Sequence, residues 1–197
     1  RQIDGVTREL VWPSMRISHC RPPGSDRDIV LMHGVEPNMR WRTFCAELLT
    51  IAEKLDVDTV VILGALLADT PHTRPVPVSG AAYSPDSAKY FGLEETRYEG
   101  PTGIVGVLHD ACSTAGIDSA SLWAAVPAYA SQVPSPKATL ALVGRLRPDN
   151  RERGATRERA HRWCLTVAGD NLRLGAATNA VRAASRWFAV ADADLGV

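Results

Sequence analysis

The stretch that decides the fold covers residues 60–107 and has the sequence VVILGALLADTPHTRPVPVSGAAYSPDSAKYFGLEETRYEGPTGIVGV. Residues 60–63 form a short apolar run, which is typical of a buried strand, and we expect this strand to end at Gly64. A polar, proline-rich loop follows, and residues 100–103 then open a second apolar segment with helical spacing. A buried strand, a polar loop and a helix start in this order form ligand sites outside the carboxyl ends of strands in α/β proteins. The stretch therefore predicts a site at that edge of a sheet, but it does not identify a substrate.

Further strands are predicted on both sides of this stretch. Residues 28–32, 57–63 and 121–126 are short and mostly apolar, which is typical of parallel strands buried on both faces. Residues 8–20 have β-forming content but contain Pro13, which favours an edge strand or a hairpin.

Segments with helical spacing separate these strands. Apolar residues recur every three or four positions between Trp41 and Ala52, and we expect Asn38 to cap this helix. A short helix is predicted over residues 84–91, and a longer one from residue 100 to near Gly116. Because strands and helices alternate, the sequence predicts an α/β fold with a mainly parallel sheet and helices on both faces.

The chain changes character near residue 143. We expect residues 1–143 to form the α/β core and residues 144–197 to form a small helical appendage, rich in Arg and Ala. Within it, residues 156–167 and 176–190 have patterns that allow helices, and a partly disordered basic tail is the alternative. The chain starts with neither a methionine nor a signal peptide, so we expect that its true beginning is missing.

Composition excludes several classes of function. The chain has 197 residues, 45% of them hydrophobic and 22% charged, with a net charge of zero. This balance gives no reason to expect a nucleic acid or a membrane as a partner. The four cysteines form no paired motif, so we interpret them as core thiols of a protein in the reducing cytoplasm, and we expect neither a metal site nor a cofactor.

The loop after residues 60–63 holds the first group of candidate site residues. Gly64 lets a loop or ligand approach the backbone, and Asp69, His72, Thr73 and Arg74 follow it. In a site, Arg74 would bind an anionic group while His72, oriented by Asp69, would act as acid or base. The alternative is a loop in which Asp69 and His72 cap backbone groups and Arg74 forms an ion pair.

A second group lies at the start of the helix that follows. Gly100, Thr102 and Gly103 would expose backbone N–H groups, and such a helix start binds anions readily. Glu99 is a candidate general base or hydroxyl-binding carboxylate beside them. Ordinary capping of the helix explains the same residues equally well.

Secondary candidates come from two other segments. Glu36 and Asn38 follow the strand at residues 28–32, although a capping role suits them better. Tyr129 follows the strand at residues 121–126 and can face the same crevice, as can Lys137, although capping or solvating a helix start suits Lys137 better. We interpret His109 as a surface residue of its helix.

Three blocks of the chain carry a resemblance to a known family. They are EPNMRWRTFCAELLTIAEKLDVDTVVILGALLADTPHTRPVPVSG, RYEGPTGIVGVLHDAC and SLWAAVPAYASQVPSPKATLALV. Together they closely resemble the PAC2 family, which is similar to proteasome assembly chaperone 2, in its actinobacterial form. The resemblance covers residue 8 to about residue 143.

The resemblance implies a three-layer α/β/α core, similar to nucleoside phosphorylases and peptidyl-tRNA hydrolases. It also implies a homo-oligomer, with a trimer as the expected form, and an N-terminal strand that is missing here. The eukaryotic members assist the assembly of proteasome α rings. Members of the family have an acidic, helical C-terminal part, from which the Arg- and Ala-rich residues of this chain depart.

Two functional hypotheses follow. The first is a non-catalytic oligomeric module that binds a partner protein such as a proteasome subunit, with an anion-accepting crevice at the carboxyl ends of the strands. The second is a small-molecule enzyme, similar to a hydrolase or phosphorylase, that acts on an anionic substrate in that crevice. We favour the first because the sequence shows no nucleophile motif or metal-ligand set. The second requires Glu99, His72 and Arg74 to converge on one cavity.

Overall fold

The computed structural model describes residues 2–3, 7–8, 12, 14–21, 28–93, 99–130, 135–146 and 162–167. The elements in chain order are β1 (Gln2–Ile3), β2 (Thr7–Arg8), β3 (Arg16–Cys20), β4 (Asp28–His33), α1 (Trp41–Lys54), β5 (Val57–Ala68), β6 (Val78–Ala82), α2 (Pro85–Phe91), α3 (Ile104–Thr114), β7 (Asp118–Pro127), the 3₁₀ helix η1 (Ala128–Ala130), α4 (Pro136–Leu146) and β8 (Arg162–Val167).

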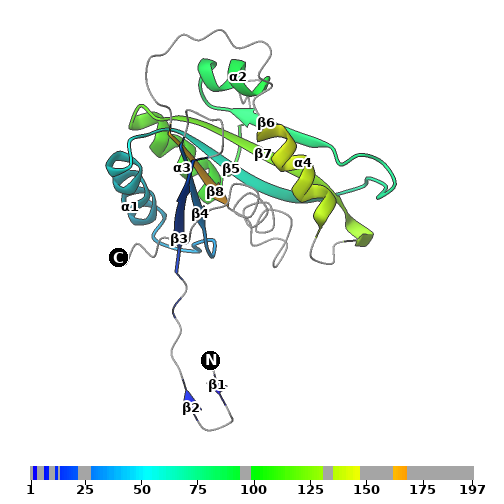
Figure 1. Cartoon of the computed structure of the whole chain (residues 1–197), viewed down its shortest axis with the longest axis horizontal. Coiled ribbons are helices and arrows are strands. Elements are labelled where there is room, and N and C mark those ends of the chain that lie inside the picture. Colours follow the sequence, from blue (N-terminus) through cyan, green and yellow to red (C-terminus); the bar gives the residue numbers. More distant parts are fainter. Residues whose placement is uncertain are drawn as a thin grey trace.

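A six-stranded sheet forms the centre of the fold, in the order β3-β4-β8-β5-β7-β6 (Figure 1). The four inner strands are parallel to one another, whereas the edge strands β3 and β6 are antiparallel to their neighbours. β1 and β2 pair as a separate two-stranded sheet. The predicted α/β fold is therefore confirmed, with a mixed sheet whose inner part is parallel.

Apolar side chains pack on both faces of the sheet because alternate residues of a strand point to opposite sides. Val30 and Met32 of β4 belong to the apolar cluster that includes α1 and α3, whereas Leu31, between them, belongs to the cluster on the other face, which includes α2 and α4. In β5 a bulge between Val57 and Thr59 shifts the register. The two clusters explain why the inner strands have almost continuously apolar sequences.

Most of the predicted elements are confirmed. The edge strand, the strands predicted at residues 28–32, 57–63 and 121–126, and the three helices predicted between residues 41 and 116 all form close to their expected positions. Ser84 caps α2 by accepting a hydrogen bond from the Ser87 backbone N–H, and Gly92 ends it in the left-handed conformation. Among the described residues, no helix is both long and apolar enough to cross a membrane.

The prediction that Asn38 caps α1 is wrong. The residue before the helix is Arg40, which has φ 58° and gives no side-chain cap, and the Trp41 indole N–H bonds to the Pro37 carbonyl oxygen at 2.7 Å. The loop between β4 and α1 is thus held by the first aromatic residue of the helix rather than by an amide cap.

The prediction of a helix over residues 156–167 is also wrong for the residues that the structure describes. Arg162–Val167 forms β8, which lies between β4 and β5 and is parallel to both. This strand, which we assigned to the appendage, therefore belongs to the central sheet. The predicted helix over residues 176–190 lies outside the described residues.

Candidate functional site

Two parallel neighbours, β5 and β7, bring the candidate loop next to a second segment. Their register ends with Ala68 opposite Pro127, so the chain leaves both strands at the same edge of the sheet. The loop after β5 returns to the sheet as β6, while β7 continues directly into η1. Loops at the carboxyl ends of adjacent parallel strands lie close together in this way whatever their separation in sequence.

His72 and Tyr129 are the residues that this arrangement joins. The His72 backbone N–H donates to the Tyr129 hydroxyl at 2.8 Å, and the same hydroxyl lies 3.0 Å from His72 Nδ1. The two rings meet edge to face with centroids 5.8 Å apart. A phenol that accepts from the backbone can donate its own proton to Nδ1 in the tautomer that carries its ring proton on Nε2.

Lys137 adds a third contact from the first turn of α4. Its Nζ donates to the His72 carbonyl oxygen at 2.7 Å. Tyr129 and Lys137 therefore hold both backbone polar groups of His72. This pairing joins the loop after β5 to η1 and to α4, which are 57 and 65 residues away in the sequence.

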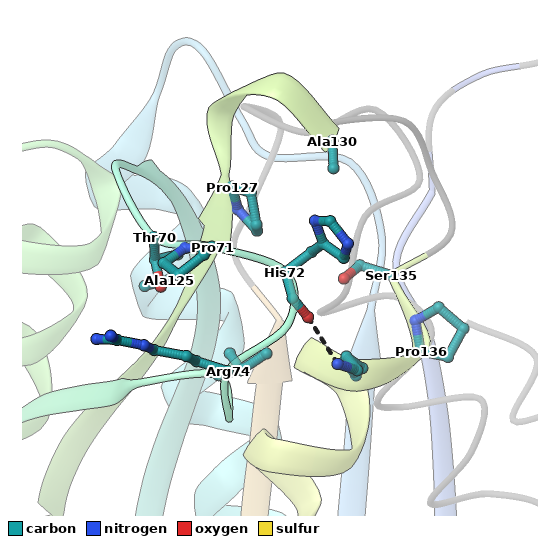
Figure 2. A pocket seen from close by; sticks show the side chains of 11 residues that line it. Thr70, Pro71, His72, Arg74, Ala125, Pro127, Ala130, Ser135 and Pro136 are labelled. Atoms are coloured by element: carbon teal, nitrogen blue, oxygen red, sulfur yellow. Dashed lines mark hydrogen bonds between the residues drawn. The ribbon is translucent and has the colours of Figure 1, made fainter.

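A depression of about 180 Å³ lies beside this contact (Figure 2). The lining residues combine apolar and proline side chains with two cations, and they are Thr70, Pro71, His72, Arg74, Val76, Ala125, Pro127, Ala130, Ser135, Pro136 and Lys137. None of these lining residues is a carboxylate. Figure 2 shows the Arg74 side chain extending away from the His72 imidazole.

The first group of candidates is only partly brought together. His72 and Arg74 line the depression, whereas Asp69 and Thr73 are exposed on the same loop and are not among its lining residues. Among the described residues, the His72 ring has its hydrogen-bond contact with Tyr129 and not with Asp69. Tyr129, a secondary candidate, is thus the residue that orients His72.

Gly64 does not end the strand as expected. It lies in the middle of β5, opposite Trp123 of β7, and β5 continues to Ala68. A Cβ atom at position 64 would collide with the six-membered ring of Trp123. The packing of an indole on the sheet therefore requires a glycine at this position.

The second group lies directly before α3. Gly103 is the residue before α3, and Glu99, Gly100, Thr102 and Gly103 are all exposed. In the part of the chain that the structure describes, none of them lines the depression beside His72. The same holds for Glu36 and Asn38, which lie in the loop between β4 and α1.

The interpretation of His109 as a surface residue is wrong. Its side chain is 1% exposed, stacks on Tyr83 with ring centroids 3.6 Å apart, and has Nδ1 2.8 Å from the Ser119 hydroxyl. Burial lowers the pKa of His109 to about 4, so the imidazole is neutral at physiological pH. The sequence held a signal for this position, because residue 109 follows Val105 by four positions and precedes Cys112 by three, on the apolar face of α3.

The cysteines and the carboxylates give no metal site in the described part of the chain. Cys20, Cys45 and Cys112 are buried free thiols. Burial and the nearby Asp28 carboxylate raise the pKa of Cys20 to about 11, which keeps that thiol protonated. No group of three or more His, Cys, Asp or Glu residues is arranged to hold a metal ion among the described residues.

Comparisons with known proteins give a family and several related structures. The PAC2 family model matches residues 1–167. A proteasome-assembly chaperone homologue from Mycobacterium tuberculosis is 71% identical, with a TM-score of 0.67, over 79% of this chain and 66% of its own. A PAC2 family protein from Streptomyces avermitilis is 59% identical, with a TM-score of 0.64, over 74% of this chain and 62% of its own.

A more distant structure shares the fold alone. It is a Mycobacterium tuberculosis protein of unknown function that is 23% identical, with a TM-score of 0.59, over 68% of this chain and 45% of its own. The chain spans less than two thirds of the length of each of these three proteins. No protein with a curated functional description matches it.

Proposed function

The chain belongs to the PAC2 family, and from this premise we propose that it is a non-catalytic, assembly-chaperone-like protein that binds a partner protein. The observation that carries the proposal is the 71% identity to a Mycobacterium tuberculosis protein described as a proteasome-assembly chaperone homologue. The partner that this relative's description suggests is a proteasome subunit. We place the role in the cytoplasm, where buried free thiols such as Cys45 and Cys112 stay reduced.

The crevice at the carboxyl ends of β5 and β7 is the contact surface in this proposal. Its supporting features are two exposed cations, Arg74 on the loop after β5 and Lys137 on α4, and the contacts by which η1 and α4 hold that loop in place. A loop held in this way loses little conformational entropy when a partner binds, which favours recognition.

The geometry does not favour the enzyme alternative. That alternative needs Glu99, His72 and Arg74 to meet at one cavity, but Arg74 extends away from His72 and Glu99 does not line the depression (Figure 2). A thermal-shift screen with phosphate, nucleosides and amino-acid-like anions, repeated on Arg74→Ala, tests it. A ligand that raises the melting temperature of the wild type but not of the variant would restore the enzyme hypothesis.

Self-association is part of the same proposal, with a trimer as the expected state. Large apolar side chains that face solvent support it: Val35 is 56% exposed and Met39 is 78% exposed, both in the loop between β4 and α1. Light scattering coupled to size-exclusion chromatography gives the state directly. A monomer at all protein concentrations would contradict this part of the proposal.

The direct test of the function is binding to proteasome α subunits from the same organism. We expect the purified chain to bind recombinant α subunits and to raise the yield of assembled rings. The control is serum albumin at the same concentration, which separates specific assistance from crowding. Absence of binding to α subunits in a host that has a proteasome would overturn the proposal.

A further inference from the structure

The depression beside His72 has a one-sided charge. Arg74 and Lys137 are both exposed and line it, and its lining contains no Asp or Glu. Residues 131–134, which connect η1 to α4, have the uncharged sequence SQVP. Asp69 lies on the same loop but is not among the lining residues. The depression is therefore complementary to a negatively charged group.

Its size and its apolar lining restrict what can enter. Pro71, Val76, Pro127 and Pro136 contribute apolar surface, and the volume of about 180 Å³ equals roughly six water molecules at about 30 Å³ each. This space suits one apolar side chain, and it is smaller than the pockets that hold drug-sized ligands, which start at about 300 Å³.

The two cations are held apart. Lys137 Nζ is bonded to the His72 carbonyl oxygen, whereas the Arg74 side chain extends away from His72 (Figure 2). Cations that point in different directions suit two carboxylates spaced along a peptide, each of which can meet one of them, better than they suit a single small anion. Lys137 has three N–H donors and uses one on His72, so two remain for a ligand.

We infer that this depression, which Arg74 and Lys137 flank, docks an acidic segment of a protein partner in which one apolar side chain stands between two carboxylates. The apolar side chain enters the space beside Val76, and the carboxylates pair with the two cations. The inference rests on the proposed function, because it gives the chemistry of the partner that the crevice of an assembly-chaperone-like protein would take.

The experiment is a titration of the ¹⁵N-labelled full chain with short synthetic peptides, followed by amide chemical shifts. The probe is acetyl-Gly-Glu-Leu-Glu-Gly-amide, and we expect shifts in residues 70–76 and 135–137 that weaken as salt rises. Peptides with Gln in place of Glu, or Gly in place of Leu, should bind about tenfold more weakly or worse. Inorganic phosphate tests for a general anion site, and equal shifts with phosphate would overturn the inference.

Charge reversal separates docking from folding. Arg74→Glu removes a cation whose side chain makes no hydrogen bond to the described residues, and we expect it to lose the acidic peptide and to gain acetyl-Gly-Lys-Leu-Lys-Gly-amide. Lys137→Glu should behave likewise, and its amide spectrum shows whether the His72 loop has kept its place. Arg42→Glu, an exposed site on α1, is the matched control and should bind as the wild type does. Unchanged binding by Arg74→Glu would overturn the inference.

The outcomes for the function and for the docking surface are distinguishable. If the chain binds proteasome α subunits and Arg74→Glu binds them equally well, the function stands and the docking inference fails. If the peptides bind as expected and the α subunits do not, the docking inference stands and the proposed partner is wrong.

Discussion

The indole of Trp123 covers Gly64 from the neighbouring strand, so position 64 in the middle of β5 has no room for a side chain. We expect Gly64→Ala to lower the free energy of unfolding by about 1–3 kcal/mol, because the new methyl group displaces the indole or the backbone. Urea denaturation followed by Trp fluorescence measures both the stability and the environment of the ring.

Gly144→Ala is the matched control for this substitution. Gly144 lies in α4, and a Cβ atom there would meet nothing within 4 Å. This variant should keep its stability or gain about 1 kcal/mol from the higher helix propensity of Ala. Equal effects of the two variants would show that Trp123 does not restrict position 64.

Burial of His109 makes the stability depend on pH. Its pKa is about 4 in the folded protein and ordinarily about 6.5, so protonation favours the unfolded chain. The stabilisation from the neutral imidazole is complete above about pH 6.5 and is lost as the pH falls through about 4. The total loss is about 3 kcal/mol.

The measurement is the free energy of unfolding between pH 7 and pH 4 for the wild type and for His109→Gln. The variant has no imidazole to protonate, so its curve should be flatter in this window, although its stability at pH 7 will be lower. Parallel curves would contradict the assignment of this pH dependence to His109.

Asp28 gives a pH dependence in a lower window. Arg21 donates two hydrogen bonds to its carboxylate, at 2.5 and 2.9 Å, and these lower the pKa of Asp28 to about 2. The stabilisation is present above about pH 3.8 and is lost as the pH falls through about 2. Asp28→Asn should lower the melting temperature by a few degrees at pH 7 and have little effect near pH 2.

The size of this effect is modest because the Arg21 side chain is 61% exposed, and water screens an ion pair of this kind. Glu47→Gln, at an exposed position on α1, is the control and should leave the melting temperature unchanged. A difference between Asp28→Asn and the wild type that persists undiminished near pH 2 would contradict the ion-pair explanation.

The Tyr129 hydroxyl should determine how firmly the loop after β5 is held. Tyr129→Phe removes the hydrogen bonds to the backbone N–H and Nδ1 of His72, so we expect the His72 amide to exchange with solvent faster. The Ala125 amide, which donates to the Pro77 carbonyl oxygen at the other end of the loop, is an internal reference. Equal acceleration at both amides would indicate general destabilisation instead of a local role.

The alternation of apolar strands and helices could be predicted from the sequence, because the spacing of apolar residues depends on which side chains are buried. The position of Gly64 was misjudged since glycine is typical both of a strand end and of a close contact inside a sheet, and only the partner strand distinguishes them. β6 has the sequence VSGAA, and its small residues show neither the alternation typical of a strand nor the three- to four-residue spacing typical of a helix. For His109, the residue type predicts an exposed side chain, whereas its position on the apolar face of α3 predicts a buried one, and the position decides.

The candidate site was harder to predict for a related reason. His72 and Arg74 could be placed in a loop at the strand ends, but their partners depend on which strands are neighbours. The contacts of His72 with Tyr129 and Lys137 arise from the pairing of β5 with β7 and from the start of α4. The prediction that Glu99 and Gly103 share a site with His72 depends only on their position after the same loop in the sequence.

The place of β8 has a consequence for how the chain reaches its native state. Among the described strands, the one that separates β4 from β5 is the last in the sequence, so the ribosome makes β8 after the strands on both sides of it. Until residue 167 has left the ribosome, the edges of β4 and β5 that pair with β8 in the folded chain have no partner strand. Both strands consist mostly of apolar residues. Unpaired edges of this kind pair readily with other chains. The nascent protein is therefore prone to aggregation until β8 has been made and has paired with β4 and β5.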